Sequence, residues 1–133
     1  MLELAARCIG GLCSRALRFP GGATMEELVL ANALGRPVPG PVPGTGRDPD
    51  GPSGVFMLPV PHPGVLRAVE GRAAAAAVAG ITGLTITIPV GQRVFPLPDG
   101  DRYLGFIFAR AGTPQDVETA LVAARDRLRV VIK

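Results

Sequence analysis

The sequence predicts an α+β fold of the ferredoxin-like kind, a split β-α-β arrangement with an antiparallel sheet and both helices on one face. Short apolar segments indicate strands, and two segments with helical periodicity begin at capping residues. From residue 65 onward the predicted order is strand, helix, strand, strand, helix, strand. The chain has 133 residues, 47% of them apolar, enough for an independent core. Because this fold class carries many functions, it does not select one.

The first 35 residues predict a strand and a helix. Residues 2–7 form a short apolar run typical of a buried strand. After the break at 19–22, Thr24 and Glu27 have the spacing of a capping box, and Gly35 can end the helix. The helix has a mostly apolar face made of Met25, Leu28, Val29, Ala31 and Leu34. This face requires a surface to pack against.

Proline and glycine dominate residues 37–54. Proline removes backbone donors and glycine adds chain entropy, so this segment predicts a linker or surface insert instead of a packed element. The expected organisation is therefore an N-terminal part over 1–35, a linker over 36–54 and an α+β domain over 55–133.

The α+β domain is expected to open with two strands and a helix. Val55–Val60 indicates a strand, and Pro59 favours an edge position because proline cannot donate to a sheet. Val65–Val69 is strand-like as well. Residues 71–79 form an alanine-rich helix that Gly80 can end.

The remaining elements complete the ferredoxin-like order. Leu84–Ile88 alternates, so Leu84, Ile86 and Ile88 should face the core. Residues 103–109 are apolar on both faces, which predicts a central strand, and 129–132 predict a last strand. Between them Thr113 should cap a helix with Pro114 at its first position. Its apolar stripe is Val117, Ala120, Leu121, Ala124 and Leu128.

The opening stretch contains the candidate functional residues. In a strand, Glu3 and Arg7 lie on one face, and Gly10 and Gly11 follow them. A carboxylate, a guanidinium and glycines that let backbone N–H groups approach a ligand suit a hard cation and an anionic oxygen. The alternative is an ordinary exposed Glu/Arg pair at a chain end.

Two segments resemble a known family of ligases. Glu3-Leu4-Ala5-Ala6-Arg7, with Gly10-Gly11 behind it, is similar to the closing segment of the ATP-grasp domain, whose pattern is Glu-x-Asn-x-Arg. The run 5–19 resembles a subset of these ligases, and the segment 98–110 resembles the C-terminal domain of L-amino-acid ligases. The similar segments cover most of the chain apart from the proline-rich insert.

The resemblance implies roles for individual residues and for ligands. Glu3 would ligate Mg²⁺ at the ATP phosphates, and Arg7 would be catalytic and bind the phosphate or substrate carboxylate. Gly10 and Gly11 would bind substrate through backbone donors. Ala5 stands where the family has asparagine, and alanine cannot coordinate a metal.

The family's nucleotide-binding lysine, glycine-rich loop and second acidic ligand would lie before residue 1. The resemblance therefore implies the C-terminal portion of an ATP-dependent carboxylate–amine ligase that acts through an acyl phosphate and is inactive alone. The implied cofactors are ATP and Mg²⁺, although the chain alone could need none. The implied partners are an ATP-grasp N-terminal portion or separate subunit and an amino-acid or carboxylate substrate.

Two other interpretations stay open. One is a free-standing ferredoxin-like binding or oligomerisation module, forming a homo-oligomer through an exposed sheet face or edge. The other is a truncated gene product. RNA binding is disfavoured, because the strand 102–109 keeps Gly105 and Phe106 of the RNA-recognition motif but has Leu104 and Ala109 at aromatic positions.

Composition and single residues narrow the remaining classes. The net charge is +3, and the arginines are scattered, so neither nucleic acid nor membrane is an expected partner. No apolar run is long enough to span a bilayer, and the opening has no signal-peptide pattern, so the expected location is the cytoplasm. Cys8 and Cys13 are expected to be reduced thiols, and His62, between two prolines, a loop histidine.

Overall fold

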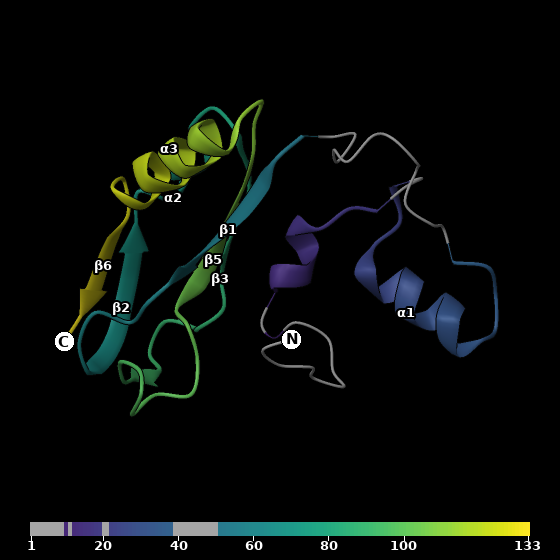
Figure 1. Ribbon diagram of the computed structural model, residues 1–133. Coiled ribbons are helices and arrows are strands. Elements are labelled where there is room, and N and C mark those ends of the chain that lie inside the picture. Colours follow the sequence, from purple (N-terminus) through teal and green to yellow (C-terminus); the bar gives the residue numbers. More distant parts are fainter. Residues whose placement is uncertain (1–9, 11, 20–21, 39–50) are drawn as a thin grey trace. The chain divides into compact units, whose positions relative to one another are not determined.

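The computed structural model describes residues 10, 12–19, 22–38 and 51–133. The chain divides into two compact units, Met1–Gly51 and Pro52–Lys133 (Figure 1). Each unit is described by itself.

The first unit contains a 3₁₀ helix, η1 (Cys13–Ala16), and the helix α1 (Met25–Ala33). The predicted capping box is confirmed: Glu27 N donates to the Thr24 hydroxyl over 3.2 Å, and Thr24 N donates to the Glu27 carboxylate over 2.7 Å. Gly35 follows the helix with φ +63°. None of the nine residues of α1 is buried, and Leu30 is 60% exposed. The strand predicted over 2–7 lies outside the described residues.

The second unit contains six strands and two helices, and its α+β class is confirmed. They are β1 (Ser53–Leu58), β2 (Gly64–Glu70), α2 (Arg72–Ala76), β3 (Ile81–Ile86), β4 (Arg93–Val94), β5 (Gly105–Arg110), α3 (Pro114–Arg125) and β6 (Arg129–Ile132). The strands form two three-stranded sheets, in the orders β1-β5-β3 and β4-β2-β6. Every strand pair is antiparallel.

The pairs β3–β5 and β2–β6 are those of a ferredoxin-like arrangement. The structure adds that β1 pairs with the second edge of β5, in register from Ser53↔Arg110 to Leu58↔Gly105 without a shift. Since β1 occupies that edge, β2 pairs with β4 and β6 instead of with β5. The predicted edge position of β1 and the predicted central position of β5 are both confirmed.

The core lies where α2 and α3 cover one side of the strands (Figure 1). Leu66, Leu104 and Ile107 have no exposed surface, and Ile88 is 4% exposed. The stripe of α3 predicted from the sequence faces this core, with Val117, Ala120, Leu121 and Ala124 buried.

The start of α3 also agrees with the sequence, since the Thr113 hydroxyl accepts a hydrogen bond from Asp116 N and Pro114 opens the helix. In β3, Leu84 and Ile86 pack against the core, as their alternation predicts.

Candidate functional site

The residues predicted to bind metal and substrate fall mostly outside the described part of the chain. Glu3, Arg7 and Gly11 are not described, so their roles stay predictions. Gly10 is described and lies exposed in a bend. Among the described residues, no group of three His, Cys, Asp or Glu side chains could hold a metal ion.

After Gly10 and Gly11, a hydrogen bond to a carboxylate of α1 connects η1 to that helix. The hydroxyl of Ser14, which is 7% exposed, donates to the Glu26 carboxylate over 2.6 Å. This bond is the main cause that holds the pKa of Glu26 below its ordinary value, followed by a backbone N–H at the start of α1 and by the charges of Arg15 and Arg18. The segment that follows Gly11 is thus held against the first turn of α1.

The second unit contains a pocket of about 290 Å³ beside the short strand β4. We call it the β4 pocket. Its lining residues are Ile88, Gln92, Arg93, Val94, Phe95, Asp99, Gly100, Asp101 and Arg102. Two of them, Ile88 and Val94, are 4% and 3% exposed and belong to the core. The pocket therefore has an apolar base and charged side chains at its opening.

The loop 95–102 forms one wall of the β4 pocket through a tight turn. Gly100 N donates to the Pro96 carbonyl over 2.7 Å. A Cβ at Gly100 would lie 2.2 Å from the Phe95 carbonyl oxygen, so only glycine fits there. At the base of the loop, the Thr87 hydroxyl donates to the carbonyls of Tyr103 and Leu104, at 3.0 and 3.2 Å. These bonds hold the wall in place without a ligand.

Two of the four charged side chains at the pocket are paired with each other. Arg102 donates to both carboxylate oxygens of Asp101, through Nε at 2.9 Å and Nη2 at 3.0 Å. This pairing lowers the pKa of Asp101 and raises the pKa of Arg102. Within the described residues, no hydrogen bond or ion pair involves the side chain of Arg93 or Asp99. One cation and one carboxylate are therefore left to meet a ligand.

Sequence reasoning did not find this pocket. The signal was present as two prolines, a glycine and four charges between Arg93 and Arg102, a composition typical of a structured loop rather than of a strand. The approach of Arg93 to that loop could not be predicted, because β4 has two residues and no periodicity.

The aromatic residues of β5 are accounted for by packing. Phe106 and Phe108 are 5% and 8% exposed. Their rings stack with centroids 6.4 Å apart, and Tyr103 meets Phe106 edge-on at 6.3 Å. Such buried rings offer no open planes for base stacking.

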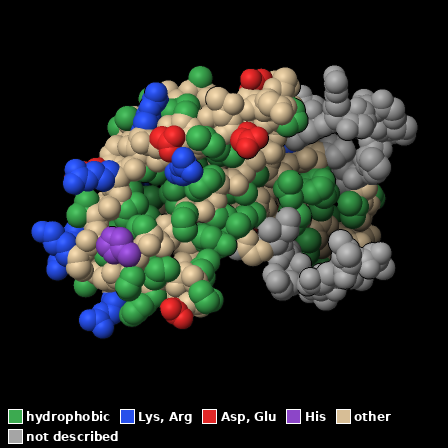
Figure 2. Space-filling model, turned by 60° about the vertical axis from the view of Figure 1, so that its left-hand side comes forward, with side chains coloured by type: hydrophobic (Ala, Val, Ile, Leu, Met, Phe, Trp, Pro, Cys, Tyr) green, Lys and Arg blue, Asp and Glu red, His purple; other side chains and the backbone are tan. Residues whose placement is uncertain are grey.

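The basic residues are dispersed, as the sequence indicates. Figure 2 shows Lys and Arg side chains spaced apart over the face turned to the viewer. His62 is exposed in a bend, and its Nδ1 lies 3.1 Å from the Pro63 carbonyl oxygen, as expected for a loop histidine. No helix in the described part of the chain is long and apolar enough to cross a membrane.

Comparison with known proteins identifies the family. The family model described as L-amino acid ligase C-terminal domain 2 matches residues 56–133. The chain belongs to this family. The match covers β2 to β6 with α2 and α3 and the second half of β1, so the L-amino acid ligase C-terminal domain 2 includes the core and the β4 pocket. The resemblance drawn from the segment 98–110 is confirmed.

A solved structure agrees with this assignment in its fold. The crystal structure of L-amino acid ligase from Bacillus licheniformis is similar to this chain with a TM-score of 0.62 and 19% sequence identity. The match covers 84% of this chain and 27% of that chain, so this chain spans about a quarter of the length of that ligase. At this identity the likeness shows the fold alone. No curated protein sequence matched the chain.

Proposed function

We propose that the chain is the C-terminal portion of an ATP-dependent carboxylate–amine ligase of the L-amino-acid ligase type. The observation that carries this proposal is the family match over 56–133. The partial coverage of the Bacillus ligase and the Glu-x-x-x-Arg pattern at Glu3 and Arg7 also support it. The proposed partner is an ATP-grasp segment, supplied by the same polypeptide or by a separate subunit.

In this proposal the reaction proceeds through an acyl phosphate, which an amine attacks. Glu3 would be a Mg²⁺ ligand, and Arg7 would hold the anionic oxygens of phosphate or carboxylate. When bound, Mg²⁺ and ATP supply charge neutralisation and the phosphoryl group. Ala5 cannot replace the asparagine of the family pattern, so further ligands must come from the partner segment. The proposed location is the cytoplasm.

The first test of this proposal is the coding sequence immediately before Met1. An ATP-grasp segment with its lysine and glycine-rich loop, in frame or in an adjacent gene, is the expected finding. Without one, Glu3 and Arg7 would have no site to complete, and the binding or oligomerisation module would be the better interpretation.

The second test is biochemical. The purified chain alone should not form amides from amino acids and ATP, whereas the chain combined with that ATP-grasp segment should release phosphate and form a dipeptide detectable by mass spectrometry. Glu3→Gln and Arg7→Gln should abolish this reaction. The matched control is Glu118→Gln on the exposed surface of α3, which should leave the reaction unchanged. Amide formation by the chain alone would contradict the proposal.

A further inference from the structure

The β4 pocket contains two opposite charges that pair with no other side chain in the described part of the chain. The guanidinium of Arg93 and the carboxylate of Asp99 both line it. Asp101 and Arg102, the other charged pair, already satisfy each other at 2.9 and 3.0 Å. The net charge of the four side chains is zero. A zwitterionic ligand, with one positive and one negative group, can therefore pair with both Arg93 and Asp99, whereas a simple anion or cation can pair with only one of them.

The backbone around Arg93 is fixed in advance. Arg93 lies opposite Val65 in the β2–β4 ladder. On its N-terminal side, the Gln92 carbonyl accepts from Leu66 N over 3.0 Å, and Gly91 N donates to the Leu66 carbonyl over 2.8 Å. Since Leu66 has no exposed surface, this end of β4 is tied to the core. Binding would not need to order the strand, which lowers its entropic cost.

The apolar base adds a third element of recognition. Ile88 and Val94 close the pocket beneath the charged opening, and the half-exposed ring of Phe95 stands beside them. A cation, a carboxylate and an apolar base together correspond to the three groups of an α-amino acid with an aliphatic side chain.

We propose that the β4 pocket binds a free aliphatic α-amino acid as a zwitterion, with its carboxylate on Arg93, its ammonium group on Asp99 and its side chain over Ile88 and Val94. This site does not include Glu3 or Arg7 and needs neither ATP nor an ATP-grasp partner. It is a binding site of the C-terminal domain itself, and the inference does not rest on the proposed function.

The test is a titration of the ¹⁵N-labelled full chain, followed by NMR amide shifts, with three isosteric probes. L-Leucine carries both charges, 4-methylpentanoate lacks the amine, and 3-methylbutylamine lacks the carboxylate. Leucine should shift the amides of residues 92–95 and 99–102 in a saturable manner. Each single-charge probe should bind about tenfold more weakly or worse, because one charge-assisted hydrogen bond is lost.

Variants separate the site from general surface binding. Arg93→Gln and Asp99→Asn should each weaken leucine binding about tenfold, and Arg93→Lys should restore part of it. The matched controls Arg72→Gln on α2 and Glu118→Gln on α3 remove the same charges away from the pocket and should bind as the parent does. The amide spectrum of each variant shows directly whether it is folded.

Three results would overturn the inference. One is the absence of saturable shifts with leucine, and another is binding of 4-methylpentanoate as tight as that of leucine. The third is unchanged leucine binding by folded Arg93→Gln and Asp99→Asn. Loss of ligase activity in the combined enzyme has no bearing on these outcomes.

Discussion

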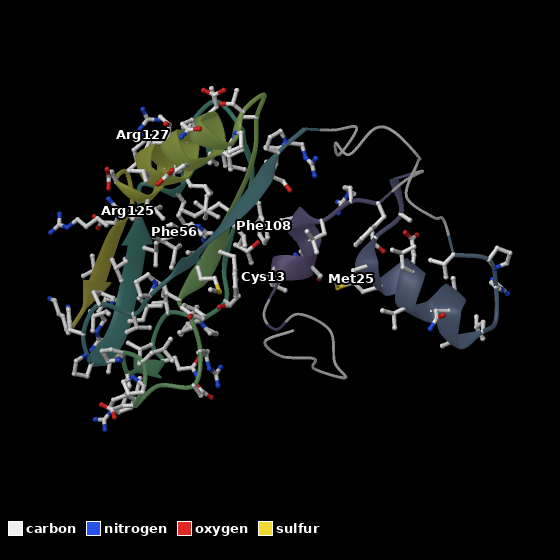
Figure 3. All side chains as sticks on the ribbon, in the orientation of Figure 1. Cys13, Met25, Phe56, Phe108, Arg125 and Arg127 are labelled. Atoms are coloured by element: carbon white, nitrogen blue, oxygen red, sulfur yellow. The ribbon has the colours of Figure 1, made fainter. Side chains whose placement is uncertain are left out.

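The guanidinium carbon of Arg125 lies 5.9 Å from the centroid of the Phe56 ring, which joins the last turn of α3 to β1 (Figure 3). The two residues are 69 positions apart in the sequence. Phe56 packs against the core from β1, and Arg125 is held in place by its bond to Asp126. A cation over an aromatic face is attractive because the ring carries negative charge density there.

Arg125→Gln should therefore lower the free energy of unfolding by about 0.5–1 kcal/mol. Urea denaturation of the variant, of Phe56→Leu and of the double variant measures the coupling between the two side chains. The control is Arg129→Gln, whose pairing with Glu70 is exposed and spans 3.8 Å, and whose removal should change stability little. Strict additivity of Arg125→Gln and Phe56→Leu would show that the contact contributes nothing.

Gly71 should be intolerant of any side chain. It has φ +78°, and a Cβ there would lie 1.9 Å from the carbonyl oxygen of Arg127, two residues after the end of α3. Gly91 has a similar φ of +91°, but nothing lies within 4 Å of its Cβ position. Gly91→Ala should thus cost only the conformational strain of about 1–2 kcal/mol, and Gly71→Ala clearly more.

Denaturant unfolding of the two alanine variants separates backbone strain from steric overlap. Equal costs for Gly71→Ala and Gly91→Ala would mean that the chain near Arg127 yields easily. In that case the approach of this segment to Gly71 would not be a constraint on the fold.

Gly54 marks the place where β1 passes closely under α3. A Cβ at Gly54 would meet Val117 Cγ1 at 2.8 Å and Leu121 Cδ1 at 3.2 Å. Gly54→Ala should overpack this contact and cost about 1–3 kcal/mol. Val117→Ala removes the nearest atom, so the double variant should lose less than the sum of the two single costs.

Gly112→Ala is the matched control for Gly54→Ala, because nothing lies within 4 Å of its Cβ position. Its stability should be unchanged or slightly higher, since alanine restricts the unfolded chain. Additive costs of Gly54→Ala and Val117→Ala in urea unfolding would argue against the predicted overlap.

The elements that the sequence predicted are those encoded by neighbouring residues. Each predicted helix start depends on residues at most three positions apart, and the structure confirms both starts. They are Thr24 with Glu27 for α1 and Thr113 with Pro114 for α3. Strand pairing depends on partners far along the chain. No local pattern therefore indicated that β5 pairs with β1 and not with β2. A two-residue strand such as β4 has too few residues for periodicity.

The candidate sites differ in the same way. Glu3 and Arg7 were predicted from a short motif with a family pattern, and they lie outside the described residues. The pair Arg93 and Asp99 forms no motif, and only the fold brings the two side chains to one pocket. To identify Arg93 and Asp99 as the unpaired charges, one must know that Asp101 and Arg102 pair with each other. That pairing is seen in the side-chain geometry and cannot be inferred from the spacing of the residues in the sequence.

The last prediction concerns the stability of α1 at acidic pH. Bonds from the Thr24 backbone and hydroxyl hold the pKa of Glu27 below its ordinary value of 4.5, and the Ser14 hydroxyl does the same for Glu26. A carboxyl group whose pKa is lower in the folded state stabilises the fold above its unfolded pKa. That contribution is lost as the pH falls below 4.5 and passes through the lowered values.

The helicity of α1 should therefore decrease in this acid range, before the core of the second unit responds. NMR titration of the glutamate carboxyl carbons should show the pKa of Glu27 rising toward 4.5 in Thr24→Val and that of Glu26 rising in Ser14→Ala. Each substitution is the control for the other, because each removes a hydroxyl bond to only one carboxylate. Thr24→Val keeps the backbone N–H bond to the Glu27 carboxylate, so the pKa of Glu27 should rise only part of the way. Unchanged titration in both variants would mean that the helix N-terminus and nearby arginines, and not these hydroxyl groups, set the two pKa values.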